Sequence, residues 1–241
     1  MRLYFIRHAQ STNNALWEQT GSGKGRHPDP EITDTGREQA HLLAQFLQRN
    51  QGEGKGDYHD FSLTHLYTSP MIRAILTGQH SAQAVQKPLT IWTDLHEWGG
   101  IYQDDEKTGE PVGLPGHSRA YLQSRFPDLH FPEEFPQDGW WNRPYETKED
   151  IAGRTLRFIQ TLLARHGQSE NNLAVIAHAG FGQMMISQLL NFSRQSEHLG
   201  IPLRFWFGIN NASISRLDFR GEQVGLTYIN RLDFLPPHLI T

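Results

Sequence analysis

The chain contains the same pattern twice: a short, wholly apolar segment that ends in a histidine. Residues 3–6 are apolar and are followed by Arg7 and His8, and residues 173–177 are apolar and are followed by His178. An apolar run of this length is typical of a strand buried on both faces of a parallel sheet. Ligands of open α/β sheets bind at the carboxyl ends of the strands. The pattern therefore predicts an α/β fold with both histidines in one crevice.

The composition excludes several classes of protein. The 241 residues include no cysteine, so disulfides, thiol catalysis and thiolate metal sites are absent. The formal net charge is −4, with no block of Lys or Arg, so nucleic acid is not an expected partner. No apolar run approaches the ~20 residues of a membrane helix, and the N-terminus lacks a signal-peptide layout. We expect a cytoplasmic protein without membrane attachment.

The histidines do not form a recognisable metal site. The chain has 13 of them, but they are scattered and show neither His-x-x-x-His nor His-Glu-x-x-His spacing. We therefore expect no metal and no cofactor. No linker divides the chain, and its length suffices for one large domain over residues 1–241.

Capping signals and apolar spacing predict the main elements in the first half of the chain. Residues 35–38 match a capping box and predict the start of a helix. Residues 66–68 predict a strand, after which Ser69 is a natural N-cap and Pro70 a natural first helical residue. Arg73 then lies one turn into that helix and can reach back to the strand end. Further expected segments are a loop at 14–30, a glycine-rich loop at 51–57 and a strand at 89–93.

The second half of the chain begins with an irregular segment. Six prolines and a Trp140-Trp141 pair in residues 99–146 indicate an insertion packed over the crevice as a lid, or only a structural cover. A helix is expected at 147–165 with Leu156, Ile159 and Leu163 on one face, and another after His178. Strands are expected at 205–209, 213–219 and 223–229.

Five short motifs, taken in order, resemble those of the histidine phosphatase, or phosphoglycerate mutase-like, superfamily. They cover roughly residues 1–97 and 147–220. They are Arg7-His8-Ala9-Gln10-Ser11 with Asn14; residues 29–36 with Gln39-Ala40; Thr68-Ser69-Pro70 with Arg73-Ala74 and Thr77; Leu95-His96-Glu97; and Ala177-His178-Ala179-Gly180. The resemblance implies a three-layer α/β/α fold with a mostly parallel sheet.

The resemblance also implies a role for each residue that matches a motif. His8 would attack phosphorus through a neutral ring nitrogen, and Glu97 would protonate the leaving oxygen. Arg7 and Arg73 would bind the phosphoryl oxygens, because guanidinium groups match phosphate, and His178 would add a donor. Neutral or backbone contacts to the substrate would come from Ser11, Asn14 and Ala179. The implied activity is hydrolysis of a small phosphorylated metabolite through a phosphohistidine, without a metal.

Departures from the family pattern leave two alternatives open. Ala9 and Ala179 stand where the family usually has glycine, and alanine is tolerated there wherever φ is negative. Cofactor-dependent mutases resemble one another in a Glu-Arg-x-Tyr-Gly motif, whereas this chain has Glu97-Trp98-Gly99-Gly100. A phosphoglycerate mutase-type transfer is therefore disfavoured. The other alternative is a catalytically idle binding module of the same fold. The physiological substrate and the oligomeric state do not follow from the sequence.

Overall fold

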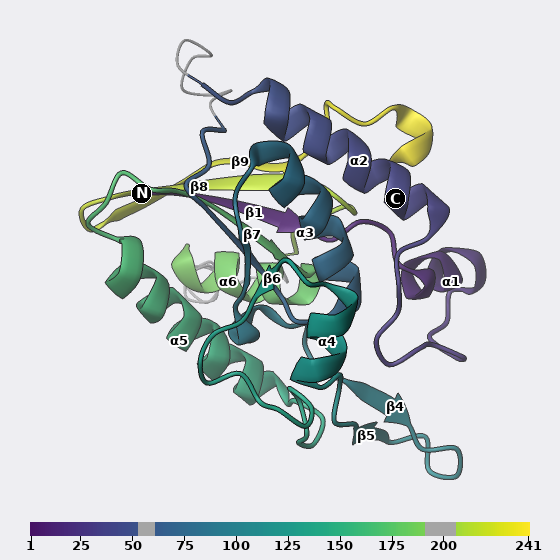
Figure 1. The fold of residues 1–241 in the computed structure, drawn as a ribbon. Coiled ribbons are helices and arrows are strands. Elements are labelled where there is room, and N and C mark those ends of the chain that lie inside the picture. The colour runs from purple at the N-terminus through teal and green to yellow at the C-terminus, as the bar shows by residue number, and fades with distance from the viewer. Residues whose placement is uncertain (53–60, 191–205) are drawn as a thin grey trace, which may run out of the picture.

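A seven-stranded sheet lies at the centre of the computed structural model, which describes residues 1–52, 61–190 and 206–241 (Figure 1). The strand order is β6-β3-β2-β7-β1-β8-β9. From β6 to β1 neighbouring strands run parallel, and β8 and β9 pair antiparallel. The strands are β1 (Arg2–Arg7), β2 (His65–Thr68), β3 (Leu89–Ile91), β6 (Leu129–His130), β7 (Asn172–Ala177), β8 (Ile214–Arg220) and β9 (Gln223–Arg231).

Helices cover both faces of this sheet, which confirms the expected three-layer α/β fold. Helices α2 (Asp34–Arg49) and α3 (Ile72–Val85) pack on one face, and α5 (Lys148–His166) and α6 (Ala179–Leu189) pack on the other (Figure 1). Successive side chains of β1 alternate between the two cores. Tyr4 and Ile6 join the α2–α3 side, whereas Leu3 and Phe5 join the α5–α6 side.

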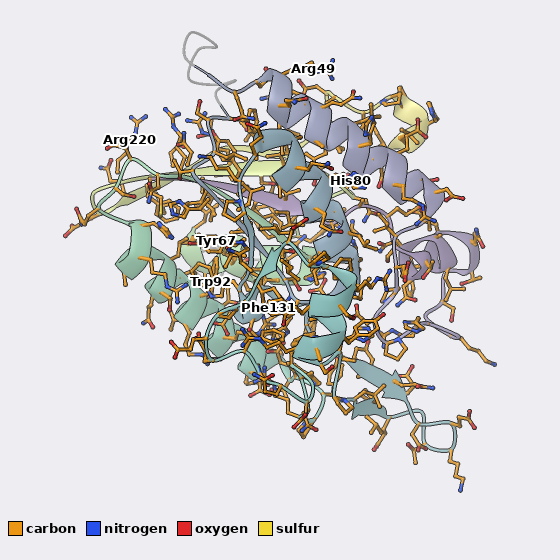
Figure 2. The ribbon with its side chains drawn as sticks, viewed as in Figure 1. Arg49, Tyr67, His80, Trp92, Phe131 and Arg220 are labelled. Carbon is orange, nitrogen blue, oxygen red and sulfur yellow. The ribbon has the colours of Figure 1, made fainter. Side chains whose placement is uncertain are left out.

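The core on the α5–α6 side continues toward the sheet edge through aromatic side chains. Tyr67 and Trp92, both labelled in Figure 2, pack edge to face with ring centroids 5.0 Å apart. Trp92 in turn contacts Phe158 of α5 at 4.8 Å. These contacts fix α5 against the sheet. On the predicted apolar face of α5, Ile159 is buried, whereas Leu156 and Leu163 are 50% and 41% exposed.

The N-terminal loops contain more helix than the sequence predicted. Thr12–Thr20 form α1, whereas a loop was expected from residue 14. Ser11 and Asn14 make a reciprocal capping box that starts α1, and Gly21 ends it in the left-handed conformation. Helix α2 begins at Asp34, because Thr33 rather than Thr35 accepts a hydrogen bond from the Gly36 N–H.

Helix α3 begins two residues later than predicted, at Ile72. Its N-cap residue is Met71, which has no side-chain cap bond, and not Ser69. The carboxylate of Asp29 supplies the missing acceptor, since its Oδ1 accepts the Ile72 N–H at 3.1 Å. This contact joins positions 43 residues apart, so local capping rules could not have found it.

Residues 99–146 are partly built into the core. They form a hairpin of β4 (Tyr102–Asp104) and β5 (Pro111–Gly113), then α4 (Arg119–Arg125), and then β6, which pairs with β3. Several of their side chains lie in the α2–α3 core: Leu122, Phe126, Leu129, Phe135, Trp140 and Trp141. A lid role for the rest of this segment stays a prediction.

The C-terminal hairpin of β8 and β9 is confirmed, with its turn at residues 221–222. Residues 206–209 are not a strand, so that part of the predicted strand 205–209 is wrong. Phe205 and most of the predicted loop 51–57 lie outside the described residues. Among the described helices, none is long and apolar enough to cross a membrane.

Candidate active site

The two strand–histidine units end side by side. Strands β1 and β7 pair in parallel with Arg7 opposite Ala177, so the residues that follow each strand meet at one sheet edge. The rings of His8 and His178 are 5.0 Å apart between centroids. Both side chains are almost fully buried. The sheet register therefore brings together two residues that are 170 positions apart in the chain.

The tautomer of His8 follows from its two hydrogen bonds. Nδ1 lies 2.7 Å from the carbonyl oxygen of Ala9, which only accepts, so Nδ1 carries the ring proton. Nε2 is then the unprotonated nitrogen, and it accepts a hydrogen bond from Arg73 Nε at 3.2 Å. Burial, aided by the charges of Arg73 and Arg7, lowers the pKa of His8 well below 6.5. His8 is consequently a neutral imidazole whose unprotonated Nε2 directs its electron pair toward Arg73.

Arg73 is held in place by a buried carboxylate. Its Nη1 is 3.7 Å from Asp29 Oδ1, and Asp29 is only 5% exposed. Burial raises the pKa of Asp29 to about 6, although the charge of Arg73 acts in the opposite direction. His117, from the segment before α4, approaches the other carboxylate oxygen at 3.8 Å. Asp29 thus links three parts of the chain: the loop with the motif at residues 29–36, the first turn of α3, and the inserted segment at residues 99–146.

Arg7 and His178 each have a buried side-chain nitrogen without a hydrogen-bond partner among the described residues. Arg7 Nη1 donates to the Ile209 carbonyl at 2.6 Å, whereas its buried Nε has no partner among the described residues. Burial lowers the pKa of Arg7 to about 10. His178 Nε2 lies 2.8 Å from Ser69 Oγ, and its Nδ1 has no acceptor among the described residues. Burial, with the Arg73 charge, lowers the pKa of His178 well below 6.5.

The carboxylate of Glu97 binds the first turn of α6. Its Oε2 accepts the Gly180 N–H at 3.0 Å, and its Oε1 accepts the N–H groups of Phe181 at 3.0 Å and Trp98 at 2.8 Å. The N-terminus of α6 provides the Gly180 and Phe181 donors, because its first N–H groups have no intrahelical acceptor, whereas the Trp98 N–H comes from the residue after Glu97. The negative charge of Glu97 raises the pKa of Arg7 and of Arg73 against the effect of burial. The carboxylate therefore lies within electrostatic reach of both arginines.

The remaining predicted residues lie at the edge of this cluster. Asn14 Oδ1 accepts from the Ser11 N–H and Oγ and from Asn211 Nδ2, which leaves the Asn14 Nδ2 for other partners. The Ser11 hydroxyl is engaged in this capping box. Ala179 is the first residue of α6 and follows His178 directly.

Several residues with structural roles at the site were missed from the sequence. Thr77 Oγ1 accepts the Ala9 N–H at 3.0 Å, and Asn211 Nδ2 donates to the His8 carbonyl at 3.0 Å. Asp29, Ser69 and Thr77 stand within the motifs quoted above, and that position was their only signal. Nothing near Asn211 in the sequence marks it. Among the described residues, no group of three or more His, Asp or Glu side chains gathers as a metal site would require.

Known proteins match both the sequence and the fold. Phosphoserine phosphatase 1 of Hydrogenobacter thermophilus is 26% identical over 231 residues, covering 89% of this chain and 85% of that one. A phosphoserine phosphatase from Entamoeba histolytica, solved with 3-phosphoglyceric acid, has a TM-score of 0.59 at 22% identity and covers 98% and 99% of the two chains. A mycobacterial glucosyl-3-phosphoglycerate phosphatase, solved with VO3, has a TM-score of 0.58 at 17% identity and covers 95% and 98%.

The two structural likenesses concern the fold alone, and the family rests on the sequence. A family model described as the histidine phosphatase superfamily (branch 1) matches residues 3–231. The match includes each of the five motifs from Arg7 to Gly180. Because it spans nearly the whole chain, the protein belongs to the histidine phosphatase superfamily, branch 1.

Proposed function

We propose that this protein is a phosphomonoesterase in which His8 Nε2 is the nucleophile. The observation that carries the proposal is the state of the His8 ring. Its proton is on Nδ1 and directed to the Ala9 carbonyl, and its Nε2 electron pair faces the Arg73 guanidinium. A neutral imidazole next to a cation that binds phosphate is the arrangement that phosphoryl transfer to histidine needs.

In the first step, Nε2 attacks the phosphorus of the ester, and the bond between phosphorus and the leaving oxygen breaks. Arg73 would exchange its contact with Nε2 for the phosphoryl oxygens, and Arg7 would bind them through its unpartnered Nε. With the Ser69 hydroxyl proton directed to His178 Nε2, His178 Nδ1 donates to the same group. These fixed donors stabilise the charge that develops on the equatorial oxygens.

In this proposal Glu97, a carboxylate in the free protein, takes a proton from the monoanionic form of the bound phosphate ester and passes it to the leaving oxygen. Each carboxyl oxygen has two lone pairs, and both lone pairs of Oε1 are used by the N–H groups of Phe181 and Trp98. Oε2 accepts the Gly180 N–H alone and has one lone pair left. Oε2 is therefore the atom that carries the proton to the leaving alcohol.

In the second step, water attacks the phosphohistidine. Glu97 Oε2, again without a proton, takes one from the water and returns it to the phosphate, the bond between Nε2 and phosphorus breaks, and inorganic phosphate leaves. Both the acid and the nucleophile return to their starting states. The sequence of steps needs no metal ion and no cofactor.

Further contacts to the substrate would come from the edge of the cluster. The capping box uses the Oδ1 of Asn14 and not its Nδ2, and the Ala179 N–H belongs to the first turn of α6. Ser11 would act mainly by orienting Asn14. The relatives named above make phosphoserine and 3-phosphoglycerate the first substrates to test. A cytoplasmic location and a lid formed within residues 99–146 remain predictions.

A panel of phosphate esters with His8→Ala as the comparison tests the proposal. The wild-type protein should release inorganic phosphate and should take up acid-labile, base-stable label from a phosphorylated substrate. His8→Ala should do neither. Label that persists on His8→Ala would contradict the nucleophile, release of an isomeric ester instead of phosphate would favour a mutase, and no turnover would favour the idle module.

A further inference from the structure

A buried ion pair lies directly behind the Glu97 loop. Arg154 of α5 is 2% exposed, and Glu146, the last residue of the inserted segment, is 6% exposed. Arg154 Nε donates to Glu146 Oε1 at 2.7 Å, and Arg154 Nη2 donates to Oε2 at 2.6 Å. This two-point contact fixes the orientation of the guanidinium group.

The remaining donors of Arg154 bind the main chain before Glu97. Nη1 donates to the carbonyl oxygens of Asp94, at 2.5 Å, and of His96, at 2.9 Å. Four of the five N–H groups of this guanidinium are therefore used, two on the carboxylate of Glu146 and two on the loop. A side chain that only filled the apolar core would need none of these hydrogen bonds.

The main chain of Glu146 binds the two residues that follow Glu97 in the chain. Its carbonyl oxygen accepts the Trp98 indole N–H at 3.0 Å, and its N–H donates to the Gly99 carbonyl at 3.4 Å. Together with the bonds from Arg154, the pair contacts the residues on both sides of Glu97 and leaves its carboxylate for α6.

Arg154 also reaches the helix that receives this carboxylate. Its guanidinium carbon lies 5.4 Å from the ring centroid of Phe181, whose N–H donates to Glu97 Oε1. The ion pair thus reaches the main chain around Glu97 and also Phe181 of α6, which are the two sides of the contact between Glu97 and α6.

We propose that Glu146 and Arg154 are positioning residues that set the place of the Glu97 carboxylate relative to the leaving oxygen. They touch neither the phosphate nor the reacting atoms. The inserted segment ends in Glu146, so its packing is linked to the position of the general acid. This inference rests on the proposed function, because it assigns to the pair the alignment of that acid.

Leaving-group dependence separates positioning from a loss of folded protein. A proton donor is required for an alkyl phosphate and much less for p-nitrophenyl phosphate, whose leaving group is weakly basic. Unfolding lowers both rates equally, whereas a displaced acid lowers only the alkyl rate. The ratio of the alkyl rate to the nitrophenyl rate is therefore the quantity to measure, by single-turnover phosphorylation of the full chain.

Arg154→Met is the main variant, and Arg216→Met is its matched control. Arg216 is also buried, at 1% exposure, and pairs with Asp218 at 2.8 Å, but on β8. Arg154→Met should lower the ratio at least ~10-fold, because displacement of a catalytic group by ~1 Å can cost ~100-fold. Arg154→Lys should recover part of the ratio. Arg216→Met should destabilise the protein without changing the ratio.

Glu146→Gln decides the question if Arg154→Met does not fold. The glutamine amide has only one oxygen that can accept hydrogen bonds from Arg154, so this variant should also lower the ratio. An unchanged ratio in the folded Arg154 and Glu146 variants, alongside a lowered ratio in Glu97→Gln, would overturn the inference and leave the proposed function intact. A wild-type protein that hydrolyses no ester would overturn both, and an unaffected Glu97→Gln would overturn the acid and the inference together.

Discussion

Two glycines of α6 allow the position of Glu97 to be tested apart from the packing of the core. A Cβ atom added at Gly180 would lie 2.6 Å from Glu97 Oε1 and 3.2 Å from Glu97 Cδ. A Cβ atom added at Gly182 would lie 2.5 Å and 2.7 Å from ring carbons of Phe5. The same substitution, two residues apart, therefore meets the carboxylate of Glu97 in one case and a buried aromatic ring in the other.

Gly180→Ala should lower activity with little effect on stability. An ordinary contact begins near 3.4 Å, so the carboxylate must retreat by about 0.8 Å, which weakens its bonds to the N–H groups of Gly180 and Phe181. A misplacement near 1 Å can reduce a rate by ~100-fold. We expect that loss for alkyl phosphates and a much smaller loss for p-nitrophenyl phosphate. Alanine in place of glycine favours the helix by up to ~1 kcal/mol, which offsets the lost hydrogen bonds in part.

Gly182→Ala should instead lower stability with little effect on activity. Phe5 is fully buried in the central strand β1, where the close packing of core side chains opposes displacement of its ring. Overpacking of this kind costs ~1–3 kcal/mol. In a chain of about this size, that corresponds to a decrease in melting temperature of roughly 2–12 °C. Each folded molecule should retain the leaving-group preference of the wild type.

The assay combines thermal melting with single-turnover rates for both esters. Full activity of Gly180→Ala toward alkyl phosphates would show that the carboxylate does not need its place on α6. An equal loss for both esters would show that Glu97 positions the substrate and does not donate the proton. A change of leaving-group preference in Gly182→Ala would assign the effect to helix α6 as a whole.

Three further predictions concern the acid, a buried carboxylate and the metal. Glu97→Gln should slow phosphorylation of His8 by alkyl phosphates ~10²–10⁴-fold and by p-nitrophenyl phosphate far less, measured by rapid quench; equal slowing would contradict the acid. Asp29 has a folded-state pKa of about 6, raised from 3.8, so the folded protein holds a proton between pH 4 and pH 6 that the unfolded chain releases. Stability from this group is thus greatest below pH 4 and is lost as pH rises to 6, by about 3 kcal/mol relative to Asp29→Asn. Urea unfolding of both proteins across that window measures the difference, and parallel curves would contradict it. Activity should survive EDTA, because Arg7 and Arg73 supply the positive charge at the phosphate, and a loss that added metal restores would refute this.

The sequence alone predicted the centre of the sheet and the residues that we propose as catalytic. Buried parallel strands need continuous apolar runs, and ligand groups follow where such strands end. His8 and His178 could therefore be assigned to one crevice from local pattern. Arg73 followed from the Thr-Ser-Pro signal, although the helix starts at Ile72 and not where that signal placed it.

Contacts between distant segments were decided by the tertiary structure. Asp29 caps α3 across 43 residues, and Asn211 binds the His8 carbonyl across 203. The motif that contains Asp29 does not reveal this contact, and nothing near Asn211 marks it, because a single side chain that bonds a remote backbone atom produces no periodicity. The contact between the Glu97 carboxylate and α6 is another contact between distant segments, because its two donors on α6 lie 83 and 84 residues further along the chain.

Helix α5 shows most directly where local reasoning fails. Apolar spacing predicted that Leu156, Ile159 and Leu163 share one face of the helix, and the structure exposes the two leucines of that face and buries Arg154. Hydrophobicity alone cannot favour a buried guanidinium, because removal of its charge from water is costly without partners. Those partners are Glu146 and two loop carbonyls, and only the folded chain brings them together.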